Sequence, residues 1–181
     1  MSAGRFIAVV GPSGVGKDTV MDAGCVRAPG MVRARRVITR SAEAGGEDAD
    51  AVTLEEFENR VRQGAFALHW QAHGLRYGIP ASVDGDLSAG RDVLANLSRA
   101  VLPELAMRFD RSMIVLLTAA PEVLAARLAT RGRETAEEQA KRLQRADFRL
   151  ADGLNPVVIR NEGTLNETVD AFLGALQAER A

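Results

Sequence analysis

The sequence reads Gly11-Pro12-Ser13-Gly14-Val15-Gly16-Lys17-Asp18 directly after an apolar run, residues 5–10, and before a predicted helix that extends to residue 27. The eight residues match the pattern G-x-x-x-x-G-K and depart from it at the next position, where serine or threonine is expected. A continuous apolar run that ends at a glycine is typical of a buried strand in a parallel sheet. The stretch therefore predicts a buried strand, a glycine-rich loop and a helix, in that order.

This order of residues has a direct chemical consequence. Glycines allow a loop to turn its backbone N–H groups inward around a phosphate chain, and the helix that follows adds its partial positive charge. Lys17 supplies a compact cation for the β- and γ-phosphates of a nucleotide. It is also one of only two lysines among 23 basic residues. We therefore expect Mg²⁺-ATP to bind here, at Gly11, Pro12, Ser13, Gly14, Val15, Gly16, Lys17, Asp18 and Thr19; the alternative is a glycine-rich turn without a ligand.

Asp18 stands where the pattern has a hydroxyl, and two interpretations remain open. A carboxylate is a hard oxygen ligand, so Asp18 could hold Mg²⁺ or one of its water molecules. Alternatively Asp18 caps the helix, and Thr19 supplies the hydroxyl to the metal ion.

Composition excludes several classes of protein. The chain has 181 residues, 46% of them hydrophobic and 26% charged, which is typical of one globular domain spanning residues 1–181. A net charge of −1 and only 4% aromatic residues argue against a nucleic-acid partner. The longest strongly apolar run, residues 113–117, is too short to cross a membrane, and the single Cys25 fits a reducing compartment. We expect a cytoplasmic protein with no membrane partner.

The rest of the chain alternates between predicted strands and helices, which indicates an α/β fold with a mostly parallel sheet flanked by helices. Thr53 with Glu56, and Thr164 with Glu167, have the spacing of capping boxes at helix starts. Residues 41–51 are expected to form a loop. The further expected strands are 31–38, 65–72, 75–79, 92–97, 112–119 and 157–160. The further expected helices are 53–64, 80–89, 100–109, one with Pro121 in its first turn, 136–150 and one after Thr164.

Several motifs resemble the guanylate kinase-like nucleoside-monophosphate kinases, in order along nearly the whole chain. They are the loop 11–17, Ile38-Thr39-Arg40, the helix start 53–57, Tyr77-Gly78, the strand entry 90–93 and the arginines of 127–145. The resemblance implies a P-loop kinase fold, an acceptor-binding insertion at about 39–80 and an arginine-rich lid at about 130–145.

The departures from those kinases concern the acceptor. His69 stands where an acid reads the guanine edge, and Ser98 stands at the position of a second acid. A tyrosine expected near Ala49 is absent, and Glu43 replaces a second phosphate-binding arginine. Without those carboxylates the guanine edge would be left unpaired, so GMP is a poor substrate candidate.

A sister family fits these positions better. The loop 11–18 with its aspartate, the segment 70–78 (W-Q-A-H-G-L-R-Y-G), Asn96-Leu97-Ser98-Arg99 and the run 131–134 (R-G-R-E) resemble the PhnN-type ribose 1,5-bisphosphate phosphokinases of phosphonate breakdown. That resemblance implies ATP-dependent phosphorylation of ribose 1,5-bisphosphate to 5-phosphoribosyl 1-diphosphate (PRPP). A phosphate acceptor is already anionic, so catalysis reduces to positioning and charge neutralisation.

The arginines suit two phosphate-rich substrates, and their alternative is a solvated surface charge. The resemblance implies catalytic roles for Lys17, Arg40, Arg131 and Arg142, and a nucleotide contact for Arg133. Acceptor contacts are expected from Arg40, His69, Tyr77, Ser98 and Arg145.

Two other functions compete with this phosphosugar kinase. One is a nucleoside-monophosphate kinase with altered base choice. The other is a catalytically silent binding module, which the intact Gly14, Gly16 and Lys17 oppose. A homodimer is left open.

Overall fold

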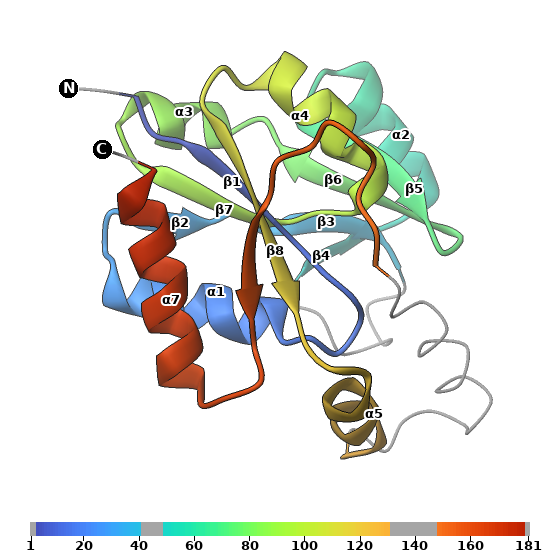
Figure 1. The fold of residues 1–181 in the computed structure, drawn as a ribbon. Coiled ribbons are helices and arrows are strands. Elements are labelled where there is room, and N and C mark those ends of the chain that lie inside the picture. Colours follow the sequence, from blue (N-terminus) through green and yellow to red (C-terminus); the bar gives the residue numbers. More distant parts are fainter. Residues whose placement is uncertain (1–2, 41–48, 131–147, 180–181) are drawn as a thin grey trace. The chain divides into compact units, whose positions relative to one another are not determined.

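The computed structural model describes residues 3–40, 49–130 and 148–179 (Figure 1). Five strands form one sheet in the order β2 (Met31–Arg33), β7 (Asp92–Asn96), β1 (Phe6–Val10), β8 (Ser112–Thr118) and β9 (Val157–Arg160). The pairs β2–β7 and β8–β9 are parallel. All five residues of β1 and of β7 are buried, which explains why both read as continuous runs rather than alternating ones. The predicted α/β class and its parallel sheet are confirmed.

A second sheet has four strands in the order β4 (Ala49–Val52), β3 (Arg36–Thr39), β6 (Leu75–Pro80) and β5 (Phe66–Ala72). β3 pairs with β4 in parallel and with β6 in antiparallel orientation. β5 and β6 form the predicted hairpin, which turns at His73 and Gly74, both with positive φ. Phe57 packs on Val37 and Val52 in a buried cluster, so helix α2 covers one face of this sheet.

The helices of the described chain are α1 (Lys17–Arg27), α2 (Leu54–Arg62), α3 (Val83–Ser88), α4 (Leu102–Arg108), α5 (Pro121–Thr130) and α7 (Leu165–Ala178), with a 3₁₀ turn, η1, at Arg99–Val101. The predicted capping box at Thr164 and Glu167 is complete. The one predicted at Thr53 is half wrong. The Thr53 hydroxyl accepts from the Glu56 N–H at 3.1 Å, but the Glu56 carboxylate pairs with Arg60 one turn later.

Residues 31–38 were expected to form one strand, and this prediction was wrong. The Ala34 N–H bonds to the Leu94 carbonyl at 2.8 Å, and the chain then leaves β2 to enter the other sheet as β3. An apolar pattern cannot show this change because both strands bury similar side chains.

Four other boundaries differ from the sequence predictions as well. The end of the expected loop 41–51 is strand β4, and residues 148–150 are not helical. The helix expected at 80–89 shortens to the six residues of α3. The helix expected at 100–109 starts as the 3₁₀ turn η1. The remainder of the expected helix 136–150 lies outside the described residues.

The chain separates into two compact units, with β1 running from the first into the second. The first comprises Met1–Ala8 and Pro29–Met113, and the second comprises Val9–Ala28 and Ile114–Ala181. The first unit therefore holds the whole four-stranded sheet, whereas the second holds the glycine-rich loop with α1, α5 and α7. In the second unit α1 and α7 pack side by side, and Arg27 pairs with Asp170 at 2.5 Å between them (Figure 1).

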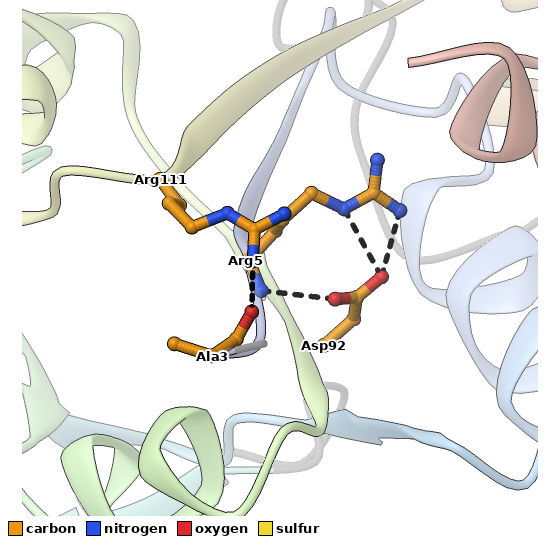
Figure 2. A network of polar contacts seen from close by, with 4 residues as sticks. All are labelled: Ala3, Arg5, Asp92 and Arg111. Atoms are coloured by element: carbon orange, nitrogen blue, oxygen red, sulfur yellow. Dashed lines mark hydrogen bonds and ion pairs between the residues drawn. The ribbon is translucent and has the colours of Figure 1, made fainter. Parts of the chain in front are cut away.

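A buried ion pair fixes the start of β1 in the first unit (Figure 2). Arg5 and Asp92 are 7% and 2% exposed, and their charged groups meet at 2.8 Å. The Arg5 backbone N–H also donates to the Asp92 carboxylate at 2.9 Å, and Arg111 donates to the Ala3 carbonyl beside it. Because removing one partner of a buried pair leaves an uncompensated charge, loss of either side chain would destabilise the start of β1.

Candidate active site

The glycine-rich loop connects β1 to α1 in the second unit. Its three glycines all have positive φ: 153° at Gly11, 83° at Gly14 and 92° at Gly16. A Cβ atom at Gly11 would lie 2.4 Å from the Leu117 carbonyl oxygen of β8, so only glycine fits there. The Val15 N–H bonds back to the Pro12 carbonyl at 3.3 Å and closes the turn. The loop therefore has the tight glycine turns that the sequence predicts between β1 and α1.

Lys17 begins helix α1 and folds back over this loop. Its ammonium donates to the Gly11 carbonyl at 2.8 Å and to the Pro12 carbonyl at 3.1 Å. The half-buried side chain thus holds its positive charge at the loop, beside the first turn of an eleven-residue helix. A positive charge, glycine turns and a helix N-terminus together fit an anionic phosphate chain.

The position of Asp18 decides one of its two interpretations. The N-cap residue of α1 is Gly16, and Asp18 lies in the first helical turn beyond it. Asp18 therefore does not occupy the capping position, and the capping interpretation is wrong. Its half-buried carboxylate lies next to Lys17 in the chain, and Thr19 is exposed. An oxygen ligand at this place fits a Mg²⁺ ion bound with the phosphates.

The rear of the loop is held by Asn161 and Thr168, which sequence reasoning missed, and by Arg127, which the sequence analysis placed only among the arginines that resemble the lid. The Val15 carbonyl accepts from the Asn161 side-chain amide at 2.7 Å and from the Arg127 guanidinium at 3.4 Å. The Asn161 amide oxygen in turn accepts from the Thr168 hydroxyl at 2.8 Å. Asn161 and Thr168 are 6% and 2% exposed. The sequence offered one signal for this contact, a polar Asn161 directly after the predicted strand 157–160.

The residues expected to bind the acceptor lie in the first unit, around the four-stranded sheet. Tyr77 on β6 pairs with Ile38 of β3 on one side and with Trp70 of β5 on the other. Its ring stacks on Trp70 with centroids 5.4 Å apart, and the Arg36 guanidinium lies 5.7 Å from its centre. Arg40 follows the end of β3, two residues beyond Ile38, and is half-buried. The structure therefore brings Tyr77 and the Arg40 backbone to one region of this sheet.

His69 lies on the other face of this sheet. It pairs with Gly78, which pairs with Val37, and successive residues of a strand alternate between faces. Its ring lies 6.4 Å from Phe66, which packs against the cluster under α2. The register therefore separates the exposed His69 from Tyr77.

Ser98 and Arg36 complete the first unit's candidates. The Ser98 hydroxyl oxygen accepts from the Ala100 N–H at 3.3 Å and so caps η1. Arg36 was missed because a single arginine in an arginine-rich chain carries little signal. It is 8% exposed and donates to the Asn96 carbonyl at 3.4 Å.

The expected lid residues Arg131, Arg133, Arg142 and Arg145 lie outside the described residues. Within residues 3–40, 49–130 and 148–179 there is no group of three histidine, cysteine, aspartate or glutamate side chains that could hold a metal ion. In the same ranges, the helices lack the length and apolar character needed to span a membrane.

The fold and the loop together define a P-loop protein of the guanylate kinase-like class. A crystal structure of guanylate kinase from Anaplasma phagocytophilum superposes with a TM-score of 0.69, covering 98% of this chain and 87% of that one at 24% identity. No protein-family model matches the chain.

Full-length relatives make the assignment more specific. The ribose 1,5-bisphosphate phosphokinase PhnN of Ruegeria sp. strain TM1040 is 50% identical, over 98% of this chain and 94% of its own length. The protein of the same name from Acidiphilium cryptum is also 50% identical, over 96% and 93%. The chain belongs to the PhnN family of ribose 1,5-bisphosphate phosphokinases.

Proposed function

We propose that this protein transfers the γ-phosphoryl group of ATP to the 1-phosphate of ribose 1,5-bisphosphate, forming PRPP and ADP in phosphonate breakdown. The bond between the γ-phosphorus and the bridging β-oxygen breaks, and a 1-phosphate oxygen of the sugar forms the new bond. The observation that carries the proposal is membership of the PhnN family over almost the entire chain. The acceptor oxygen is already anionic, so no general base is needed.

The donor side of the proposal uses the second unit. We assign the triphosphate to the N–H groups of the loop 11–16 and to the Lys17 ammonium, which is held by two loop carbonyls and can exchange them for phosphate oxygens. Mg²⁺ bound with the nucleotide neutralises phosphate charge, and Asp18 is the residue we assign to its ligand shell. This assignment is supported by the place of Asp18 in the first turn of α1, beyond the cap.

The acceptor side uses the first unit. We assign the sugar phosphate to the Arg40 guanidinium and the Tyr77 hydroxyl, whose backbones the register of β3 and β6 brings near one another. The stack of Trp70 on Tyr77 restricts the tyrosine ring, and a restricted donor loses less entropy when the ligand binds. Ser98 and His69 remain predicted contacts, although the register places His69 on the opposite face from Tyr77.

We further propose that Arg131, Arg142 and Arg145 contact the phosphates during transfer, with Arg133 on the nucleotide. Bidentate guanidinium contacts match the equatorial oxygens of a transferring phosphoryl group. We also propose that the protein acts in the reducing cytoplasm. Its small-molecule substrates and its single cysteine, Cys25, support this location.

The test is ADP release measured with ribose 1,5-bisphosphate, GMP and AMP as acceptors at equal concentrations. The proposal predicts turnover with the sugar bisphosphate and little with either nucleotide. Lys17→Met should lower that turnover about 10²–10³-fold, the usual loss when a donor that stabilises developing charge is removed. Fastest turnover of GMP would instead identify a nucleotide kinase. Mg²⁺-ATP binding without turnover on any acceptor would identify a silent binding module.

A further inference from the structure

Asn161 and Thr168 form a buried polar chain behind the glycine-rich loop, and the proposed chemistry above does not use it. Asn161 follows β9, where its backbone N–H bonds to the Thr118 carbonyl of β8 at 2.8 Å. Its side-chain amide donates to the Val15 carbonyl at 2.7 Å and accepts from Thr168 at 2.8 Å. The contact ties the last strand of the second unit to the middle of the loop.

The contact fixes the direction of one peptide group. A peptide unit is planar and trans, so its C=O and N–H point in opposite directions. When Asn161 holds the Val15 carbonyl toward the protein interior, the N–H of Gly16 is turned the opposite way. Gly16 has a φ of 92°, and because glycine adopts positive and negative φ about equally readily, local sterics alone do not fix the orientation of this peptide.

Burial makes this constraint specific. Val15 is fully buried, and a buried carbonyl without a partner is costly, so Val15 depends on its donors within the protein. Of its two donors in the described part of the chain, Asn161 is the closer, at 2.7 Å against 3.4 Å for Arg127. The orientation of the Asn161 amide is defined because its oxygen accepts a hydrogen bond from the Thr168 hydroxyl. Its NH₂ group is therefore the side that faces Val15.

Thr168 is itself placed by the start of α7. Thr164 and Glu167 form the capping box of that helix, and the Thr168 hydroxyl also lies 3.2 Å from the Thr164 carbonyl. The shorter of its two contacts is the one with Asn161. A Cβ atom on Gly16 would lie 2.8 Å from the Asn161 amide nitrogen, so side chain and loop are in direct contact.

We propose that Asn161, oriented by Thr168, is a positioning residue for nucleotide binding. It holds the Val15–Gly16 peptide so that the Gly16 N–H faces the phosphate chain. The inference rests on the proposed function, because it assumes that the loop binds a nucleotide.

The test compares ADP binding, measured by calorimetry with Mg²⁺, among variants of the full chain. Asn161→Leu keeps the branching of the side chain and removes both polar atoms. We expect its ADP affinity to fall about tenfold, the factor that loss of one buried hydrogen bond carries. In turnover assays its KM for ATP should rise, whereas its KM for the acceptor should stay unchanged. Asn166→Leu, at an exposed asparagine of α7, is the matched control and should bind ADP as the wild type does.

Thr168 provides a second pair of variants in case Asn161→Leu does not fold. Thr168→Val is isosteric and lacks the hydroxyl, so it should weaken ADP binding in the same direction. Thr168→Ser keeps the hydroxyl and should bind ADP with the wild-type affinity. A merely structural role would lower thermal stability and leave the affinity of the folded protein unchanged.

Equal ADP affinities for wild type, Asn161→Leu and Thr168→Val would overturn this inference and leave the proposed function standing. Absence of ADP binding to the wild type would overturn both.

Discussion

Replacing Gly16 by alanine tests how closely the glycine-rich loop packs against the Asn161 side chain. At a φ of 92° an alanine costs about 1–2 kcal/mol, because its Cβ crowds the backbone. The new Cβ would also lie 2.8 Å from the Asn161 amide nitrogen, where ordinary contacts begin at 3.4 Å. The amide must retreat by roughly 0.6 Å, which takes its 2.7 Å bond to Val15 to the limit of a hydrogen bond.

The loss of that bond adds about 1–1.5 kcal/mol, so Gly16→Ala should lower the free energy of unfolding by about 2–3.5 kcal/mol. Gly153 is the matched control. It has a φ of 86°, and an added Cβ would meet nothing within 4 Å. Gly153→Ala should therefore show the backbone cost alone, about 1–2 kcal/mol.

Urea denaturation of the two variants supplies the comparison. In an Asn161→Ala background the additional cost of Gly16→Ala should disappear, giving a coupling free energy of about 1 kcal/mol in a double-mutant cycle. If Gly16→Ala is no more destabilising than Gly153→Ala, or if the cycle shows no coupling, the contact between Gly16 and Asn161 does not constrain the loop.

Three further outcomes are expected. Asp18→Ala should raise the Mg²⁺ concentration for half-maximal turnover about tenfold or more, as losses around a metal's ligand shell do; an unchanged Mg²⁺ titration would remove Asp18 from that shell. Phe57→Ala should lower the free energy of unfolding by about 3–5 kcal/mol, because Phe57 is 1% exposed and its ring stacks 4.7 Å from Phe66; a loss under 1 kcal/mol in urea denaturation would contradict the packing. The backbone N–H and hydroxyl of Thr164 lower the pKa of Glu167, so its stabilisation is present above the unfolded-state pKa and is lost as pH falls through the lower folded-state pKa. Glu167→Gln should lack this part of the acid dependence, and identical stability profiles for both proteins below about pH 4.3 would refute it.

The parts of the site that depend on neighbouring residues could be predicted from the sequence. The loop between β1 and α1 is encoded by eight consecutive residues, and the hairpin of β5 and β6 by a turn at His73 and Gly74. The complete capping box at Thr164 is equally local. In each case the residues that interact are close in sequence, so spacing alone identifies them.

The parts that depend on distant contacts could not be predicted. Asn161 reaches Val15 across 146 positions, and no spacing rule connects them. His69 and Tyr77 are assigned to opposite faces by the register of β5 against β6, and the sequence alone does not determine that register. Arg36 is buried because β3 lies in the four-stranded sheet, and the sequence pattern did not separate β3 from β2.

The most direct test of the proposed function is to identify the product by phosphorus NMR. The protein is incubated with Mg²⁺-ATP and ribose 1,5-bisphosphate, and the same reaction with Lys17→Met is the control. We predict a new diphosphate signal, split by coupling between its two phosphorus atoms, with loss of the sugar 1-phosphate signal and formation of ADP in equal amount. Formation of ADP and inorganic phosphate with the sugar bisphosphate unchanged would contradict the account.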